Sequence, residues 1–307
     1  MSAPAPDRWG LRENGLTQRP LPPHFNDAAY CAAMDAAVHA NVAAALSEDV
    51  GSGDRTGDLL DPDGLVAAQL IVREAAVLCG TNWFDAVLQA VDPRLQAVWL
   101  AKDGDLLEAN SIVCRLAGPA RSLLTAERSA MNFLQLLSGV ATLTRRYVSS
   151  IAGVPGNRAR ILDTRKTMPG LRLAQKYAVR MGGGINQRLG LYDAILIKEN
   201  HIAAAGGIAA ALHAALGKGV PVQIEVETLD QLDAALAAGA VSILLDNFSL
   251  QGLRDAVART AGRAVLEASG GINLASVRDV AATGVDRISV GSLTKDVRAT
   301  DYSLRVV

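Results

Sequence analysis

The chain has 307 residues and a formal net charge of −1, and half of its residues are apolar while only 4% are aromatic. This length allows one large domain or two smaller ones, and a core of Ala, Val, Leu and Ile favours the many close-packed elements of an α/β protein. The near-neutral charge argues against a nucleic-acid-binding protein, which would carry a basic face over much of its domain. The three cysteines, Cys31, Cys79 and Cys114, are too widely spaced for a disulfide framework or a metal cluster and suit a reducing cytosol.

The N-terminus lacks the basic segment and apolar run of a signal peptide, and we expect a flexible tail over residues 1–25. The most apolar stretch, residues 202–217, is too short and too weakly hydrophobic to span a bilayer. We therefore expect a cytoplasmic protein that binds neither membranes nor nucleic acid.

The next part of the chain, up to about residue 120, mixes helical and strand patterns. Apolar residues four apart predict a helix over 27–48, and a second helix is expected near 82–91. Alternating segments predict strands at three places: 66–72, 97–100 and 112–116. Turn residues at both ends of 104–118 predict a β-hairpin there. This region is typical of an α+β layer.

A long helix is predicted from Ser122 to about Ile151 by an apolar stripe. After Arg160, short apolar runs alternate with helical patterns, and this alternation indicates a parallel sheet. The runs are Ile161-Leu162, 194–197, 222–226, 243–245, 264–266 and 288–290. Six such units fit an incomplete α/β barrel, with a doubly wound open sheet as the alternative. The dinucleotide-binding version of that sheet is disfavoured because no G-x-G-x-x-G follows a first strand.

Every predicted strand of this second region ends in polar, charged or glycine-rich residues. These ends are DTRK at 163–166, KENH at 198–201, EVE at 225–227, DN at 246–247, EASGG at 267–271 and VGS at 290–292. In parallel barrels the loops after the strands carry the active site, so this convergence predicts a site at one end of the barrel.

The segment from Arg160 to His201 is strongly basic, with eight Lys or Arg against three Asp or Glu. In a nearly neutral protein this surplus indicates a local site for a small, highly charged anion. Arg165, Lys166, Arg188 and Lys198 could clamp carboxylates or phosphates.

Two glycine-containing loops could hold a phosphate group. Ser269, Gly270 and Gly271 follow a strand and precede a helix expected to open at Asn273, whose N-terminus would favour an anion. A second loop, formed by Val290, Gly291 and Ser292, could complete the site. The alternative interpretation is a pair of tight turns.

Carboxylates at the ends of two strands could bind Mg²⁺ or ribose hydroxyls. Asp246 ends a buried strand, and Glu225 and Glu227 alternate with Gln223 on one face of another. The alternative is that these carboxylates only pair with nearby Lys and Arg.

Other polar residues have simpler expected roles. Arg172, Lys176 and Arg180 fall on one helix face and are expected to be solvated. Arg128 cannot face its neighbour Glu127 on a helix, so it needs another partner. His201 is expected to form a hydrogen bond rather than to bind a metal.

These motifs resemble the quinolinate phosphoribosyltransferase family. The resemblance runs from EDVGSGDRTGDLL through AERSAMNFLQLLSGVAT, the block from DTRKT to KENH, LLDNF and LEASGGI to GVDRISVGSLTKDV, and covers nearly everything after about residue 41. It implies a fold with an N-terminal α+β sandwich at 26–141, an incomplete TIM-like α/β barrel at 142–295, and a segment at 296–307 that packs back on the first domain.

The resemblance also implies an activity. Phosphoribosyl pyrophosphate and quinolinate would react, with Mg²⁺ as cofactor, to give nicotinate mononucleotide, pyrophosphate and CO₂ in de novo NAD biosynthesis. The working unit would be a homodimer in which Arg128 reaches the neighbouring subunit's site.

Each predicted site residue receives a role from this resemblance. The TRKT motif (Thr164, Arg165 and Lys166) and Arg188 would bind the substrate carboxylates, and Lys198 would lie near the reacting centre. Glu225 and Asp246 would hold ribose and Mg²⁺ and take part in catalysis with Lys198. Ser269 to Gly271 and Val290 to Ser292 would cradle the 5′-phosphate.

The chain departs from the family at one position, since Gln187 stands where a His commonly precedes Arg188. An amide can donate a hydrogen bond but cannot carry a proton, which argues against an obligatory acid–base role there. A transferase for another acceptor such as nicotinate, and a non-catalytic sensor of a phosphorylated metabolite, are the alternative functions.

Overall fold

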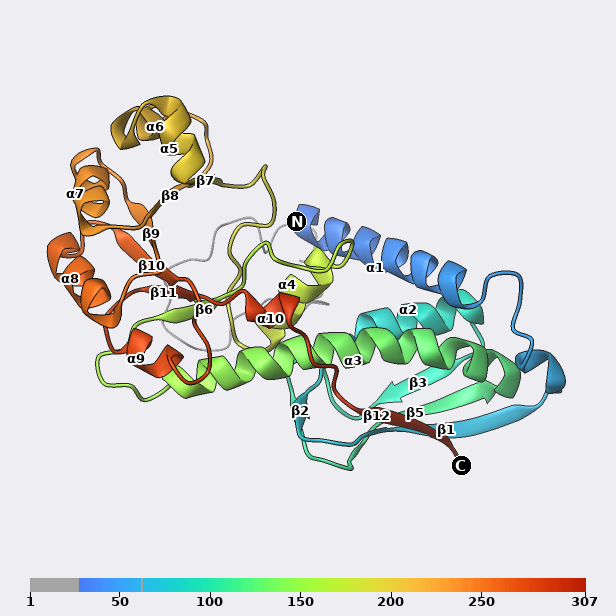
Figure 1. Ribbon diagram of the computed structural model, residues 1–307. Helices are drawn as coiled ribbons and strands as arrows, with labels where there is room; N and C mark the ends of the chain where they lie inside the picture. Colours follow the sequence, from blue (N-terminus) through green and yellow to red (C-terminus); the bar gives the residue numbers. More distant parts are fainter. Residues whose placement is uncertain (1–27, 62) are drawn as a thin grey trace, which may run out of the picture. The chain divides into compact units, whose positions relative to one another are not determined.

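The computed structural model describes residues 28–61 and 63–307, and the predicted tail at 1–25 lies outside them (Figure 1). The chain forms two compact units. The first comprises the described residues up to Ser138 together with Ala299–Val307, and the second comprises Gly139–Arg298. In the described part of the chain, none of the helices combines the length and the apolar character needed to cross a membrane.

The first unit contains a four-stranded antiparallel sheet in the order β12-β1-β5-β3. Its strands are β1 (Leu65–Val72), β3 (Gln96–Trp99), β5 (Ile112–Pro119) and β12 (Tyr302–Val306). Helices α1 (Ala28–Asp49) and α2 (Thr81–Val91) lie on one side of this sheet (Figure 1). The predicted helices and the three predicted strands of this region are therefore confirmed.

The predicted hairpin at 104–118 is wrong. The short strand β4 (Leu106–Leu107) pairs with β2 (Ala76–Val77), whereas β5 pairs with β1 and β3. Asn110 adopts φ 63° in the connection, and its N–H donates to the carbonyl of Val72 at the end of β1. This bond starts β5 beside β1, so β4 finds a different partner.

The C-terminal strand completes the sheet of the first unit. β12 pairs with β1, and Tyr302 lies opposite Val72. The Tyr302 hydroxyl is buried and lies 3.0 Å from Ser138 Oγ, which also donates to the carbonyl of Cys79. Burial raises the pKa of both Tyr302 and Cys79, so both side chains remain neutral.

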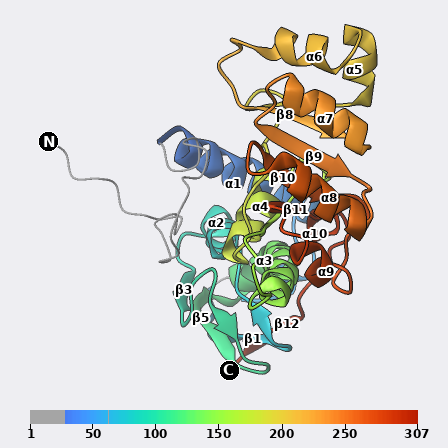
Figure 2. The same cartoon turned by 90° about the vertical axis from the view of Figure 1, so that its left-hand side faces the viewer.

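The second unit contains a six-stranded parallel sheet in the order β6-β11-β10-β9-β8-β7. Its strands are β6 (Arg160–Leu162), β7 (Ile195–Ile197), β8 (Val222–Val226), β9 (Ser242–Asp246), β10 (Val265–Ser269) and β11 (Arg287–Ser289). The helices that accompany them are α4 (Arg172–Met181), α5 (Glu199–Ala205), α6 (Ile208–Ala215), α7 (Leu229–Ala237), α8 (Leu250–Thr260), α9 (Val277–Ala281) and α10 (Ser292–Lys295). Figures 1 and 2 both show α7 and α8 along the same side of β8 to β10.

The strand order identifies an incomplete barrel rather than a doubly wound sheet. The first strand, β6, pairs with the last, β11, and the strands from β7 to β11 follow one another in chain order. A doubly wound sheet would instead reverse its order at a switch point. Leu162 also bridges Ile185 on the other side of β6, which begins to fill the gap toward β7. The α/β-barrel prediction is therefore confirmed.

The long helix predicted from Ser122 to Ile151 is confirmed as α3 (Ala120–Ile151). Leu123, Leu134 and Leu137 of its apolar stripe are fully buried. At roughly 2 kcal/mol for each such side chain, this burial stabilises the helix far more than its intrinsic propensity does.

Candidate active site

The polar strand ends of the second unit meet at one edge of the barrel, as the sequence predicts. Because the six strands are parallel, their carboxyl ends lie on the same side. Two close approaches show this directly. Lys198, after β7, contacts Glu225 on β8, and Gly291, after β11, lies against Lys166 and Thr164, after β6.

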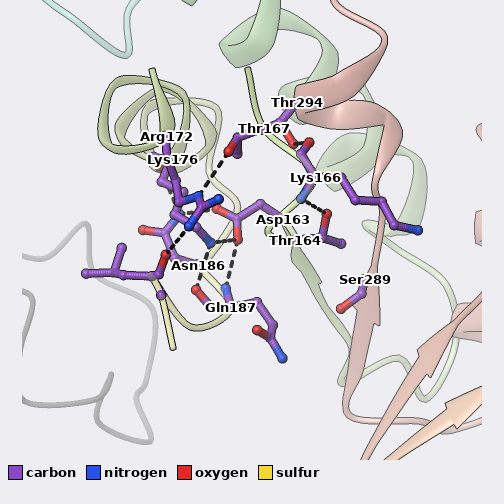
Figure 3. A network of polar contacts seen from close by, with 12 residues as sticks. Asp163, Thr164, Lys166, Thr167, Arg172, Lys176, Asn186, Gln187, Ser289 and Thr294 are labelled. Atoms are coloured by element: carbon purple, nitrogen blue, oxygen red, sulfur yellow. Dashed lines mark hydrogen bonds and ion pairs between the residues drawn. The ribbon is translucent and has the colours of Figure 1, made fainter. Parts of the chain in front are cut away.

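A buried ion pair lies beneath this edge. Lys176 of α4 and Asp163 are both fully buried, and Lys176 Nζ lies 2.5 Å from Asp163 Oδ1 (Figure 3). Asp163 also accepts from Asn186 Nδ2 at 2.5 Å and from the N–H of Gln187 at 2.9 Å. The expectation that Lys176 is solvated is therefore wrong, because the helix face that carries it packs onto the chain around Asp163. Lys176 also donates to the carbonyl of Gln187 at 2.8 Å.

This network fixes the main chain that leads into Arg188. Gln187 is held at its N–H by Asp163 and at its carbonyl by Lys176, while Asn186 donates to the carbonyl of Lys176. Burial raises the pKa of Asp163 and lowers that of Lys176, and the attraction between the two charges opposes both shifts. The pair therefore supports the main chain of Gln187, and the charge of each partner stabilises the charge of the other.

Arg165 and Arg188 differ from the other cations of the site in their hydrogen bonding. The Nε atoms of both are buried, and neither has a hydrogen-bond acceptor within the described ranges. Burial and the neighbouring Arg165 guanidinium lower the pKa of Arg188, although an arginine starts so high that it stays charged at neutral pH. Arg188 uses NH1 to donate to the carbonyl of Ala194 at 3.2 Å, and the buried Nε atoms of the two guanidinium groups leave donors that suit an anionic ligand.

The remaining cations of the site lie around Arg165 and Arg188. Lys166 is exposed, its N–H donates to Thr164 Oγ1 at 3.1 Å, and its side chain points away from Asp163 (Figure 3). Arg172 was expected to be solvated, but it is partly buried and donates to Thr167 Oγ1 and to the carbonyl of Leu189. Arg180 is likewise only partly exposed.

Lys198 and Glu225 form an ion pair, with Nζ 2.7 Å from Oε2 and 3.0 Å from Oε1. Glu225 is nearly buried, whereas 42% of the Lys198 side chain is exposed. The N–H of Lys198 donates to Nδ1 of His201 at 3.0 Å, which is the hydrogen-bonding role expected for this histidine. An accepting Nδ1 places the imidazole proton on Nε2.

Asp246 ends β9, the strand beside β8, and its Oδ2 accepts from Asn247 Nδ2 at 2.7 Å. A small cavity of about 160 Å³ adjoins this region and is lined by Glu199, Glu225 and Glu227 among others. No group of three or more His, Cys, Asp or Glu among the described residues could hold a metal ion. Glu225 and Asp246 nevertheless suit Mg²⁺, which is usually held by one or two carboxylates together with substrate phosphates.

Two loops offer unpaired backbone amides. Within residues 28–61 and 63–307, no hydrogen bond is recorded from the N–H of Gly270, Gly271, Ile272, Gly291 or Ser292. A Cβ at Gly270, which has φ 99°, would lie 2.1 Å from Asn247 Oδ1, whereas nothing lies within 4 Å of a Cβ at Gly271. Gly270 is thus required by packing, and Gly271 leaves space beside the free amides. Since β10 and β11 are neighbours, the free amides of the two loops follow adjacent strands, an arrangement that suits an anion.

The helix expected to open at Asn273 begins later. Residues 273–276 form a turn in which Asn273 Oδ1 accepts from the N–H groups of Ala275 and Ser276, and α9 starts only at Val277. The Asn273 side chain satisfies two N–H groups that a helix opening here would leave without acceptors. The free amides of residues 270–272 precede this turn and belong to a loop.

Arg128 belongs to the first unit. It is exposed on α3, and no hydrogen bond or ion pair of its side chain is recorded with any described residue. It is therefore available to a partner from outside the unit, which agrees with the expectation that Glu127 is not its partner.

Three buried polar residues of the barrel interior were not recognised from the sequence as site residues. Gln223, Glu267 and Ser289 form a hydrogen-bonded line from Gln187 into the barrel. The alternation of Gln223 with Glu225 placed Gln223 on the correct face. Its partners could not be predicted from the sequence, because Glu267 lies two strands away in the sheet and Gln187 lies in a connection between α4 and β7.

An open α/β barrel with two arginines whose Nε atoms lack acceptors among the described residues, and with free loop amides at other strand ends, is typical of an enzyme that acts on small anionic molecules. Comparison with known proteins agrees. The model of the quinolinate phosphoribosyl transferase C-terminal domain matches residues 140–305, and that of the N-terminal domain matches residues 54–138. The chain therefore belongs to the quinolinate phosphoribosyltransferase family.

Individual relatives are similar over most of their length. The nicotinate-nucleotide pyrophosphorylase [carboxylating] of Mycobacterium leprae is 42% identical, with 85% of this chain and 94% of that protein covered. The probable nicotinate-nucleotide pyrophosphorylase [carboxylating] of Bacillus subtilis is 40% identical, with coverage of 84% and 90%. The solved structure of the nicotinate-nucleotide pyrophosphorylase from Francisella tularensis has a TM-score of 0.86 and 46% identity and covers 89% of this chain and 97% of that one.

Proposed function

We propose that this protein transfers the phosphoribosyl group of phosphoribosyl pyrophosphate to quinolinate with loss of CO₂, giving nicotinate mononucleotide and pyrophosphate for NAD biosynthesis. The observation that carries the proposal is the pair Arg165 and Arg188, whose adjacent guanidinium groups have buried Nε atoms without partners. Quinolinate carries two carboxylates and matches this pair in charge. The family membership of the chain supports the same reaction.

Each substrate has a place at the barrel edge in this proposal. Arg165 and Arg188 hold the quinolinate carboxylates, with Lys166 and Thr164 beside them. The loop amides at Ser269–Gly271 and Val290–Ser292 hold the 5′-phosphate of phosphoribosyl pyrophosphate. The ribose hydroxyls lie at Glu225 and Asp246, so the anomeric carbon faces the pyridine nitrogen.

The reaction then requires positioning and charge compensation. The ring nitrogen forms a bond to the anomeric carbon while the bond to pyrophosphate breaks, through a state with positive charge on the ribose. Glu225 and Asp246 stabilise that charge, and Lys198, which uses two of its three N–H bonds on Glu225, directs the third toward the leaving group. The bond between C2 and its carboxylate then breaks as CO₂ leaves, the electron pair stays on C2 where the adjacent positive ring nitrogen stabilises it, and C2 takes up a proton.

Mg²⁺ is part of the proposal, with Glu225 and Asp246 as its protein ligands. When bound, it offsets the negative charge of the pyrophosphate group. A cytoplasmic homodimer is also proposed. The three cysteines are free thiols, as suits a reducing compartment, and the exposed Arg128 is available to complete the site of a second copy.

The test is an assay of CO₂ release from quinolinate, with phosphoribosyl pyrophosphate and with or without Mg²⁺. Arg165→Ala and Arg188→Ala should each raise the KM for quinolinate at least tenfold, because a hydrogen bond to a charged group contributes about 1.5–3 kcal/mol. Binding of both substrates by calorimetry without CO₂ release would point to a sensor. Equal or better turnover of nicotinate would point to a different acceptor.

A further inference from the structure

Four polar side chains form a continuous line through the interior of the barrel. Gln187 Nε2 donates to Gln223 Oε1 at 2.9 Å, Gln223 Nε2 donates to Glu267 Oε2 at 2.9 Å, and Ser289 Oγ donates to Glu267 Oε1. Gln223, Glu267 and Ser289 are buried, and Glu267 is fully so. The line connects the deep interior to the residue beside Arg188.

The position of these residues shows that the line crosses the inside of the barrel. Gln223 is on β8 and Glu267 is on β10, and β9 lies between those two strands. Two side chains that bond across an intervening strand must both point to the concave face of the sheet. The line therefore lies on the same face as Glu225, two residues along β8 from Gln223.

The chemistry of Glu267 gives the line a direction. Both oxygens of Glu267 accept hydrogen bonds, Oε2 from Gln223 and Oε1 from Ser289, whereas a Gln side chain has a donor end and an acceptor end. Gln223 must therefore turn its amino group to Glu267 and its carbonyl to Gln187. Gln187 in turn must donate to Gln223, so its amide cannot flip without losing the bond.

One donor of Gln187 remains. Its Nε2 has two N–H bonds, only one of which is used by Gln223, and the other meets no acceptor recorded among the described residues. The main chain of Gln187 is held independently by Asp163 and Lys176. The remaining N–H thus belongs to a side chain held in place on the residue that precedes Arg188, whose Nε is buried without an acceptor among the described residues.

We propose that Gln223 and Glu267 are positioning residues that orient Gln187 so that its second N–H donates to a carboxylate of the substrate. The inference rests on the proposed function, because that function places a carboxylated pyridine at Arg188. This arrangement makes position 187 selective for a hydrogen-bond acceptor on the ligand. The selectivity comes from the amide of Gln187, which does not titrate. A carboxamide in place of that carboxylate would have to present its own carbonyl, and a ligand with no group there would leave the N–H unpaired.

The test compares Glu267→Gln, Gln187→Ala and the double variant in the CO₂-release assay. Glu267→Gln introduces a side chain that can donate as well as accept, so the amides of Gln223 and Gln187 can both flip. The KM for quinolinate should then rise about tenfold, as expected for the loss of one hydrogen bond to a charged group. The KM for phosphoribosyl pyrophosphate should change less than twofold. The double variant should be no worse than Gln187→Ala alone, because Glu267 acts through Gln187.

A purely structural role would give a different result. If both KM values rose together, or if the two losses added fully in the double variant, the proposal would be overturned. Glu48→Gln, an exposed carboxylate-to-amide change in the first unit, is the matched control and should have no effect. Should Glu267→Gln fail to fold, Gln187→Ala decides alone, since unchanged quinolinate KM in that variant also overturns the proposal.

The failure of this inference and the failure of the proposed function are distinguishable. If the unaltered protein releases no CO₂ from quinolinate, the proposed function fails. If the unaltered protein is active and the variants behave like it, only the positioning role of Gln223 and Glu267 is lost.

Discussion

The side chain of Lys198 is held by Glu225, because its ammonium group donates to both carboxylate oxygens of that residue. Removing the lysine takes away a cation at the proposed reacting centre and also leaves Glu225 without its counter-charge. We predict that Lys198→Ala lowers kcat more than a hundredfold, since an electrostatic group of this kind contributes about 3 kcal/mol. Steady-state kinetics measure this, and Lys218→Ala, an exposed lysine of the same unit, serves as the control. Near-normal turnover of Lys198→Ala would exclude the role.

The buried pair of Asp163 and Lys176 leads to a prediction about stability and pH. Lys176→Met leaves Asp163 buried without its counter-charge, and burial already raises the pKa of this carboxyl. A raised pKa in the folded state means that the protonated form is tolerated and that stability is lost as the pH rises through the raised value. The variant should therefore lose about 3 kcal/mol at pH 8 and less at pH 5.

Thermal or denaturant unfolding at the two pH values measures this difference. The double variant Asp163→Asn/Lys176→Met leaves no buried charge, so its loss should be the same at both pH values. A loss in Lys176→Met that is independent of pH would contradict the assignment.

At the scale of single residues, the sequence identifies which side chains end the strands but not what surrounds them. Lys198 was predicted to belong to the site because it follows an apolar strand, and Glu225 because it lies near the carboxyl end of another. Lys176 was misread because its spacing of four from Arg172 and Arg180 fits a solvated face, and only the fold reveals that Asp163 lies beneath it. Burial of a charge depends on a partner distant in the sequence, and one sequence without its fold does not contain that partner.

At the scale of elements, Asp92 links the end of α2 to the beginning of α3. It accepts from the side chain and N–H of Arg94 and from Ser122 Oγ. The hydrogen bonds from Arg94, followed by that from Ser122, hold the pKa of Asp92 well below its usual range. A lowered pKa gives stability that is present above the ordinary Asp pKa of about 4 and is lost as the pH falls below it.

Asp92→Asn should therefore lower the Tm at pH 7, and the difference from the unaltered protein should shrink as the pH falls below about 4. Differential scanning calorimetry across this range measures the effect. Asp279→Asn, an exposed carboxylate with no hydrogen bond recorded among the described residues, should show neither change. A difference that grows at low pH would contradict the prediction.

Elements with long periodic patterns were predicted well, and the errors lie in short connections. The apolar stripe of α3 and the alternation of strands and helices in the second unit identified both correctly. The hairpin at 104–118 was misjudged because the N–H of Asn110 donates to Val72, which lies far away in the sequence on β1. The start of α9 was misjudged because Asn273 forms a local turn with the residues that follow it. Residue periodicity reports neither kind of hydrogen bond.

At the scale of the whole molecule, the last nine residues belong to the unit that contains the beginning of the described chain. Deleting Ala299–Val307 removes β12 and the Tyr302 hydroxyl that bonds to Ser138. It also exposes the edge of β1 as a template for pairing with other chains. We predict a lower Tm and concentration-dependent aggregation, measured by thermal unfolding and light scattering.

Deleting only Val307, which is 70% exposed, should have a much smaller effect and is the control. Hydrogen exchange should locate the change in the β1 amides that pair with β12 from Ala68 to Val72. Protection of these amides in the longer deletion would contradict the prediction.

The pairing of β12 with β1 also determines when the sheet of the first unit can form during synthesis of the chain. β1 is translated before the barrel and its outer neighbour β12 after it, so the entire barrel is synthesised while that edge of β1 has no partner strand. The barrel can begin to fold on the nascent chain, whereas the sheet of the first unit must wait until β12 has been translated. A stalled or prematurely terminated chain would therefore carry an uncovered strand, which makes it a substrate for chaperones and proteases.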